Sequence, residues 1–332
     1  MANITAKQVA DLRAKTGLGM MDCKKALVEA EGDFERAKEI IREKGKLVAA
    51  KRADRETSEG AAIAKVNGNK AIVVALGCET DFVAKNAEFQ ALAEAIAETA
   101  IANFPADKDA LMACVLADGR TVEAAVTEQT GKTGEKHQVA GYEVVEAPYI
   151  VAYMHNVTGK LAALVGFNKE FDAQVAKGVA MQVASMNPVA VSAESVPQSV
   201  IDAEIKTATE KTKEELVQKA VDAALSKAGI NPAHVDSEAH IESNQAKGWI
   251  TAEQAEQARE IIKTVSAEKA ANLPEQMVAN IAKGRLQKFF KEQTLEEQGY
   301  QMGDGKTAVK DVVKAADAEA KILCFKRLSL AD

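Results

Sequence analysis

The segment AAIAKVNGNKAIVVALG, Ala61–Gly77, has the pattern of two β-strands joined by a tight turn. β-branched residues occur in both of its arms, and Asn67-Gly68 lies between them. Asn-Gly is favoured in short hairpin turns because both residues tolerate the positive φ angles that these turns require. We therefore predict an antiparallel hairpin here, followed by an amphipathic helix over about 87–102.

The same order of elements recurs further along the chain. Residues 148–154 and 161–167 form a second pair of apolar runs around a glycine-containing turn, and a helical pattern follows over about 170–185. Because an isolated hairpin is only marginally stable, each copy needs a third strand. We predict that residues 142–146 complete the first sheet and that residues 322–326 complete the second. The chain therefore contains an internal duplication of a β-β-α unit.

The residues before the first hairpin have the spacing of three short helices. Thr16-Gly-Leu-Gly19 separates the first helix from the second, and Gly32-Asp33 opens a third that we expect to run through Ile41. The next residues are basic and poor in core positions. We predict a three-helix module over residues 1–45 and a basic linker over residues 46–60.

A helical segment interrupts the second copy before its last strand. Apolar and charged residues alternate at helical spacing over 200–227, and Thr251-x-x-Gln254 resembles a capping box for a second helix. We expect an antiparallel helical hairpin. The predicted fold class is α+β, with core subdomain 1 over 61–147, core subdomain 2 over 148–190 and 273–328, and an inserted coiled-coil hairpin over 191–272.

The composition excludes several functional classes. The chain of 332 residues carries a net charge of −7, with 47% hydrophobic and 27% charged residues, which is ordinary for a soluble globular protein. We expect no direct nucleic-acid partner, because contacts to phosphates require a basic surface. No apolar run approaches the ~20 residues of a membrane span, and no basic and apolar leader opens the sequence. We expect no membrane contact and a cytoplasmic location.

The sequence also lacks a recognisable catalytic or metal-binding motif. The four cysteines lie far apart, and the four histidines do not form H-E-x-x-H or accompany a nucleophile elbow. Gly303–Thr307 resembles part of a phosphate-binding loop, but Tyr300 stands where that motif needs glycine. We interpret Thr307 instead as the N-cap of a helix over 308–315. We therefore predict no enzymatic activity.

Three predicted turns carry unusual residues. Met20-Met21 begins the second helix, Asp81-Phe82 follows the second strand, and His155 lies at the tip of the second hairpin. Each has an ordinary structural explanation when it is taken alone. The methionines could pack in a core, Phe82 could be a helix staple, and His155 could be a solvated turn residue.

Two of these turns lie in stretches that resemble signature sequences of the bacterial elongation factor Ts family. These stretches are TGLGMMDCKKAL at Thr16–Leu27 and TDFVAK at Thr80–Lys85. The similarity continues weakly through Gly284–Phe289 and Lys306–Val309, so it covers nearly the whole chain except about 195–272. Family members have a three-helix module similar to ubiquitin-associated domains, two related α/β subdomains with small antiparallel sheets, and an inserted helical hairpin.

The resemblance implies a function as nucleotide exchange factor for elongation factor Tu. In the family, the pair matching Asp81 and Phe82 enters the partner GTPase beside its Mg²⁺ and loosens GDP. The segment implied to displace Mg²⁺ is therefore Thr80, Asp81, Phe82 and Val83. The implied partner contacts are Leu12, Gly19, Met20, Met21, Lys24, Lys85 and His155. The resemblance also implies that GDP, GTP and Mg²⁺ belong to the partner, so this chain needs no cofactor.

Two features depart from the family pattern. The insertion over 191–272 is longer than the usual hairpin, which leaves a homodimer or a 2:2 complex open as its role. The sequence ends soon after its last predicted strand, whereas many members continue into a C-terminal helix. A competing interpretation is an adaptor with a ubiquitin-associated-like module, a coiled-coil arm and no exchange activity. The TDFVAK stretch favours the exchange factor, because an adaptor has no need of it.

Overall fold

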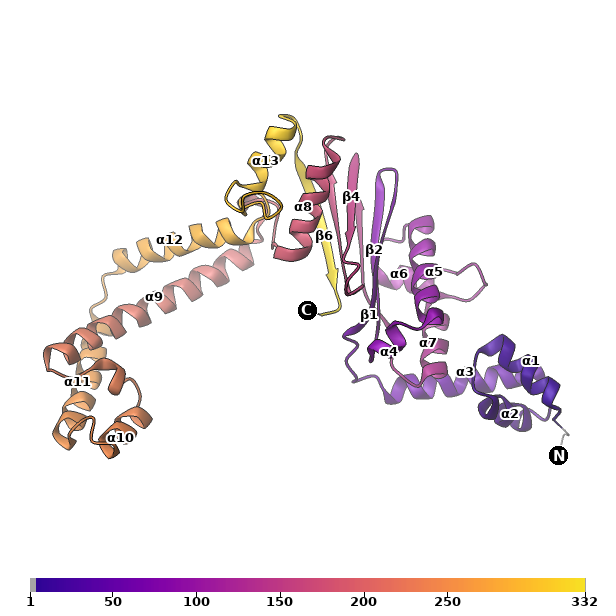
Figure 1. The fold of residues 1–332 in the computed structure, drawn as a ribbon, viewed down its shortest axis with the longest axis horizontal. Helices are drawn as coiled ribbons and strands as arrows, with labels where there is room; N and C mark the ends of the chain where they lie inside the picture. The colour runs from indigo at the N-terminus through magenta and orange to yellow at the C-terminus, as the bar shows by residue number, and fades with distance from the viewer. Residues whose placement is uncertain (1–3, 332) are drawn as a thin grey trace. The chain divides into compact units, whose positions relative to one another are not determined.

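Two antiparallel sheets, each of three strands, organise the part of the chain that the computed structural model describes, residues 4–331 (Figure 1). The strand orders are β1-β2-β3 and β4-β5-β6. The strands are β1 Glu59–Asn67, β2 Lys70–Cys78, β3 Gln138–Glu146, β4 Tyr149–Met154, β5 Leu161–Phe167 and β6 Ile322–Ser329. The α+β class is confirmed, and both predicted third strands are confirmed as β3 and β6.

The first hairpin turns one residue later than Asn67-Gly68. Its register pairs Asn67 with Lys70, so the two-residue loop is Gly68-Asn69. Gly68 has a φ of 61°, which glycine adopts without the steric penalty of a Cβ atom. Glycine at the first loop position is the arrangement of a type II′ turn, whose twist matches that of the flanking strands.

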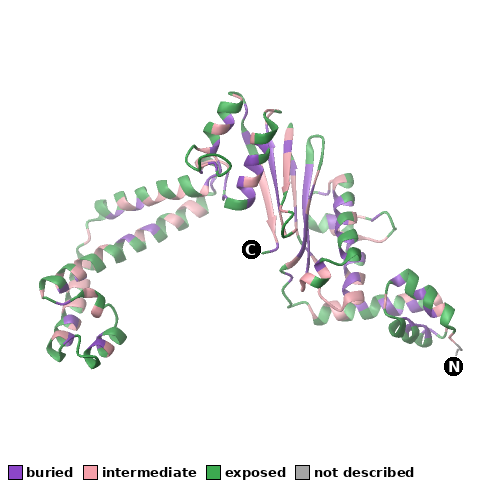
Figure 2. Cartoon of the chain, viewed as in Figure 1, coloured by how far each residue is buried: buried purple, intermediate pink, exposed green. Residues whose placement is uncertain are grey.

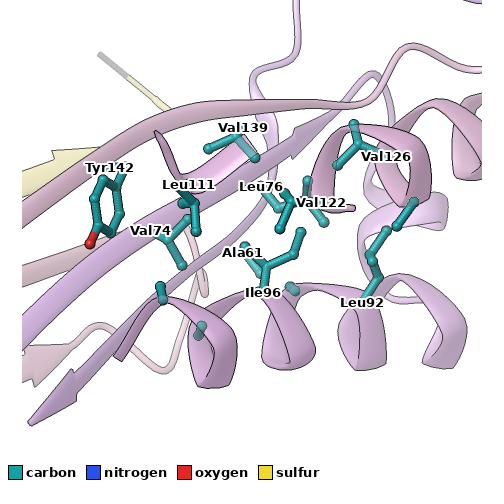
Figure 3. Close-up of a cluster of buried hydrophobic side chains, with 14 of the residues drawn as sticks. Ala61, Val74, Leu76, Leu92, Ile96, Leu111, Val122, Val126, Val139 and Tyr142 are labelled. Carbon is teal, nitrogen blue, oxygen red and sulfur yellow. The ribbon is translucent and has the colours of Figure 1, made fainter. Parts of the chain in front are cut away.

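Strand β2 is buried on both of its faces. Ile72, Val74 and Leu76 contribute to a core on the helical side of the first sheet. That core is covered by α5 Ala87–Asn103, α6 Lys108–Ala113 and α7 Val122–Thr133. Figure 3 shows Val74 and Leu76 facing Leu92 and Ile96 of α5 and Val122 and Val126 of α7.

The opposite face of β2 packs on the second sheet. Ala71, Val73 and Ala75 join a buried cluster with Ala162 and Leu164 of β5. Small side chains on both inner faces allow the two sheets to approach closely. Figure 2 shows β2 and β5 mostly in the colour of buried residues. The outer side of the second sheet carries α8 Ala173–Met186, and α13 Val309–Ala316 packs on α8.

The N-terminal helices are α1 Ala6–Thr16, α2 Met20–Glu29 and α3 Phe34–Lys51, which share a small core. The prediction that the third helix ends near Ile41 is wrong. The prediction that a linker begins at residue 46 is also wrong, because α3 continues to Lys51. The helix continues because its second half packs on α7, where Gly45 faces Gly131. This contact is made by glycines, so it leaves no apolar periodicity in the sequence.

Residues 192–297 form a separate compact unit, apart from the unit that contains both sheets. Its helices are α9 Gln198–Lys227, α10 Glu238–Ala246, α11 Ala252–Ala271 and α12 Glu275–Gln293. The boundary predicted at residue 273 is wrong, because α12 packs along α9 and belongs to the insertion. An Arg285–Glu215 ion pair of 2.5 Å joins these two helices. Pro274 separates α11 from α12, since proline lacks the N–H that a continuous helix would need.

Within residues 4–331, each helix is too short or too polar to cross a membrane.

We predict that Gly131→Val lowers the stability of the α3–α7 contact. A Cβ on Gly131 would lie 3.0 Å from the Gly45 Cα atom, so a valine must push the two helices apart. Overpacking of this kind costs about 1–3 kcal/mol in the free energy of unfolding. Gly284→Val is the matched control, because a Cβ there has no neighbour within 4 Å. Equal thermal midpoints of the two variants, measured by circular dichroism, would contradict the prediction.

Candidate functional site

Phe82 is displayed to solvent at the end of the first sheet. Its side chain lies on the short helix α4, Asp81–Ala84, which begins three residues after β2 ends at Cys78. The residue is 84% exposed. The helix-staple explanation is therefore wrong, because a staple requires the ring to pack on the helix that follows. We call Thr80–Lys85 the Phe82 turn.

Polar contacts hold the Phe82 turn in place. Thr80 is the N-cap of α4, and its hydroxyl accepts a 3.4 Å hydrogen bond from the Val83 N–H. Glu135 binds Thr80 with both carboxylate oxygens, at 3.1 Å from the backbone nitrogen and 2.7 Å from the hydroxyl. The backbone on both sides of Phe82 is thus fixed, although its ring is exposed.

Asp81 forms an ion pair within the same turn. Lys85 Nζ lies 2.7 Å from Asp81 Oδ2. The hydrogen bond from Lys85 lowers the pKa of Asp81 from its ordinary value, so the carboxylate is charged near neutral pH. Both side chains are well exposed. A partner could therefore take over either charge without disturbing the core.

A second set of contacts anchors the residue before the turn. Glu79 accepts two hydrogen bonds of 2.8 Å from Arg52 Nη1 and one of 2.6 Å from the Lys136 N–H. Burial favours a higher pKa for Glu79, but the bonds from Lys136 and Arg52 outweigh it, so the pKa is lowered. Lys136 Nζ also donates to the carbonyls of Ala53 and Arg55, at 2.7 and 2.9 Å.

Sequence reasoning missed Arg52, Glu79 and Glu135. Arg52 lies in the basic run that we interpreted as a linker, and Glu135 follows a helix that we did not predict. Their partners are 27 and 55 positions away. A single sequence contains no local spacing that would connect them.

A groove of about 240 Å³ brings the second hairpin to the Phe82 turn. Asp81 and Lys85 line it from one side, and His155 lines it from the other. The hairpin tip is held there by a 2.8 Å hydrogen bond from the Ala62 N–H to the Gly159 carbonyl. His155 Nδ1 lies 2.9 Å from the hydroxyl of Tyr153. The structure therefore brings His155 to Asp81 and Lys85, which lie at least 70 positions before it in the sequence.

Helix α2 presents a second exposed surface. Met20 and Met21 are 47% and 64% exposed, so the explanation that they pack in a core is wrong. Gly19 and Lys24 are exposed beside them, and Val28, which we did not predict, is exposed one turn beyond Lys24. We call Gly19, Met20, Met21, Lys24 and Val28 the α2 face.

Leu12 does not belong to either surface. Its side chain is fully buried in the core of the three N-terminal helices, where it packs among residues such as Cys23 and Leu27. The prediction that Leu12 contacts a partner directly is therefore wrong. Leu12 instead supports the helix that carries the α2 face.

The residues suspected of phosphate or metal binding have other roles. The Asp304 carboxylate accepts hydrogen bonds from the N–H groups of Lys306 and Thr307 and from the Thr307 hydroxyl. The N-cap of α13 is Ala308, so the N-cap role predicted for Thr307 is wrong. Across residues 4–331, no group of three or more His, Cys, Asp or Glu side chains could hold a metal ion.

Comparisons with known proteins identify one family. A family model described as Elongation factor TS matches residues 79–332. Curated proteins named Elongation factor Ts from Phocaeicola vulgatus and Bacteroides fragilis are each 55% identical over 327 residues. The protein of that name from Christiangramia forsetii is 41% identical over 334 residues. These alignments cover 98–99% of this chain and 98–100% of the relatives.

We predict that His137 makes the folded state sensitive to mild acid. Its ring is buried beside Phe89, its Nδ1 lies 2.9 Å from the Glu135 carbonyl, and its Nε2 has no hydrogen-bond partner within the described structure. Burial lowers the pKa of His137 below its ordinary value. The unfolded chain therefore binds a proton that the folded chain excludes, so stability falls as the pH drops through about 6.5.

The variant His137→Gln tests this dependence, because glutamine does not titrate and can still donate to the Glu135 carbonyl. Urea unfolding at pH 7.5 and pH 5.5 should show a smaller loss of stability for the variant than for the wild type. Identical losses in the two proteins would rule out His137 as the source.

Proposed function

Because this chain belongs to the elongation factor Ts family, it serves in translation elongation, and we propose that it is a guanine-nucleotide exchange factor for elongation factor Tu. The observation that carries the proposal is the Phe82 turn. An aromatic ring that is 84% exposed stands on a backbone fixed by Glu135 and Thr80. Such a ring has no role in the core of this chain and is available to enter a partner.

The exchange mechanism follows from how a GTPase holds its nucleotide. Tight binding of GDP to a GTPase depends on coupled contacts, because Mg²⁺ bridges phosphate oxygens and protein oxygen ligands. An exchange factor shifts this equilibrium only if it binds the opened site more tightly than the closed one. Insertion of Thr80, Asp81, Phe82 and Val83 beside the Mg²⁺ site would meet this condition. In this proposal the Phe82 ring becomes buried in the partner only when the Mg²⁺ ligands of the partner have left their closed arrangement.

The expected size of the effect comes from the burial of one aromatic side chain. Moving a fully exposed phenylalanine into an apolar environment is worth about 1.5–3 kcal/mol. If this energy is gained only in the opened state, it speeds GDP release by about 10- to 100-fold. No bond is made or broken by this chain, which acts as a binding protein in the proposal.

The other surfaces would hold the partner while the Phe82 turn acts. We assign the grip on the GTPase domain to the α2 face, because exposed methionines adapt their shape to a partner surface. Lys85 and His155, which line the same groove, would contact a further part of the partner. GDP, GTP and Mg²⁺ belong to the partner in this proposal. A homodimer or a 2:2 complex through the helical insertion, the absence of direct nucleic-acid contacts and a cytoplasmic location remain predictions.

We predict that Phe82→Ala reduces the acceleration of GDP release by about 10- to 100-fold without lowering the thermal midpoint. The fold should be unaffected because the ring is exposed. Stopped-flow release of fluorescent GDP from elongation factor Tu measures the rate. An unchanged rate would exclude the assigned role of Phe82. If the wild-type chain binds elongation factor Tu without accelerating release, the adaptor interpretation is favoured instead.

We predict that the double variant Met20→Ala, Met21→Ala weakens binding rather than exchange itself. The concentration for half-maximal acceleration should rise about tenfold, because apolar contact area is lost, while the maximal rate stays nearly constant. Met302→Ala is the matched control, since Met302 is similarly exposed, at 48%, and lies outside both surfaces. A lower maximal rate, or an equal effect of the control, would contradict this assignment.

A further inference from the structure

We infer that Glu135 and the Arg52–Glu79 pair are positioning residues that tie the Phe82 turn to helix α3. We call Arg52, Glu79, Glu135 and Lys136 the clamp. The inference rests on the proposed exchange function and deepens it. The clamp would hold the α2 face and the Phe82 turn at a fixed separation. Binding of the α2 face to the partner would then also position the Phe82 ring.

The clamp joins three chain segments pairwise. Arg52 at the end of α3 binds Glu79, which directly precedes the Phe82 turn. Lys136 binds Glu79 through its backbone N–H and binds the carbonyls of Ala53 and Arg55 through Nζ. Its neighbour Glu135 binds Thr80. All these contacts involve at least one charged group, and such hydrogen bonds are shorter and stronger than neutral ones.

Glu135 acts on Phe82 without touching its ring. One carboxylate oxygen accepts from the Thr80 backbone and the other from the Thr80 hydroxyl. That hydroxyl in turn accepts from the Val83 N–H, so the hydrogen bonds form a continuous chain across the turn. Successive hydrogen bonds polarise and strengthen one another. Removal of the carboxylate would leave the ring exposed but would release the backbone that aims it.

Helix α3 connects the clamp to the α2 face. It is a continuous helix of 18 residues, about 27 Å long at 1.5 Å per residue. In its first half, Ile40 and Ile41 pack in the core that supports α2. Farther along, Gly45 packs against Gly131 of α7. The two surfaces are therefore connected by one helix. Once the α2 face has bound the partner, the helix limits the positions that the Phe82 turn can reach on that partner.

The clamp contributes more to geometry than to overall stability. The Arg52 and Glu79 side chains are 37% and 16% exposed, and Glu135 is half-buried. Ion pairs in such partly solvated positions typically add little to the free energy of unfolding. Loss of the clamp should therefore reduce the maximal exchange rate of a chain that remains folded.

The test uses the full chain and compares Glu135→Gln and Arg52→Ala with wild type. GDP release from elongation factor Tu is measured over a range of chain concentrations. We expect the maximal rate of each variant to fall about fivefold to tenfold, with less than a twofold change in the half-saturating concentration. Thr80→Val removes the hydroxyl that donates to Glu135 and should resemble Glu135→Gln.

Glu143→Gln is the matched control, because it removes an ion pair of 2.6 Å with Lys326 on the same sheets but away from the clamp. It should behave like wild type. Amide hydrogen exchange of the unbound variants gives a readout independent of activity. Exchange in residues 79–85 should accelerate in Glu135→Gln, while exchange in α5 stays unchanged.

Three outcomes would overturn the inference. Wild-type maximal rates in both clamp variants would show that the clamp does not position the turn. An unchanged maximal rate with a raised half-saturating concentration would make these residues affinity determinants. Faster hydrogen exchange throughout α5 would indicate a merely structural role. If wild type itself fails to accelerate release, the proposed function fails. If Phe82→Ala loses activity and the clamp variants do not, only this inference fails.

Discussion

The packing of the two sheets through β2 is the contact on which the rest of the molecule depends. Ala71, Val73 and Ala75 point to the second sheet, and Ile72, Val74 and Leu76 point to the helices. A strand buried on both faces cannot shift its register by one residue without exchanging these two sets. On the second sheet, a Cβ on Gly166 would lie 2.8 Å from the Ala147 Cβ atom, so only glycine allows this approach.

This double layer determines where the functional surfaces lie. Because β2 is held on both faces, the position of its end at Cys78 is determined, and the Phe82 turn starts from there. Because β4 and β5 pack against the first sheet, their connecting turn lies where Ala62 can bind Gly159. His155 is therefore placed in the same groove as Lys85 by the packing of the two sheets together with the hydrogen bonds at the hairpin tip.

The polar contacts around the Phe82 turn have a different role from the core. Glu79 and Glu135 lie at the margin of the sheet and bind groups from α3 and from the turn itself. Apolar packing resists any change in the volume of a side chain, whereas charge-assisted hydrogen bonds fix the orientation of the groups that they join. A ring that is proposed to enter another protein requires this combination, because it cannot be anchored by burial in its own core.

Patterns short enough to lie within one element could be predicted from the sequence, and these include both hairpins, their third strands and the helices over 87–102 and 200–227. The TDFVAK stretch indicated the exchange function through resemblance to a family. The extent of α3, the membership of α12 in the insertion and the clamp depended on tertiary structure. Each involves a partner far away in the sequence, such as Gly131 for Gly45 or Glu135 for Thr80. Local periodicity predicts which face of a helix or strand is apolar. Which other element packs on that face is decided only when the chain folds.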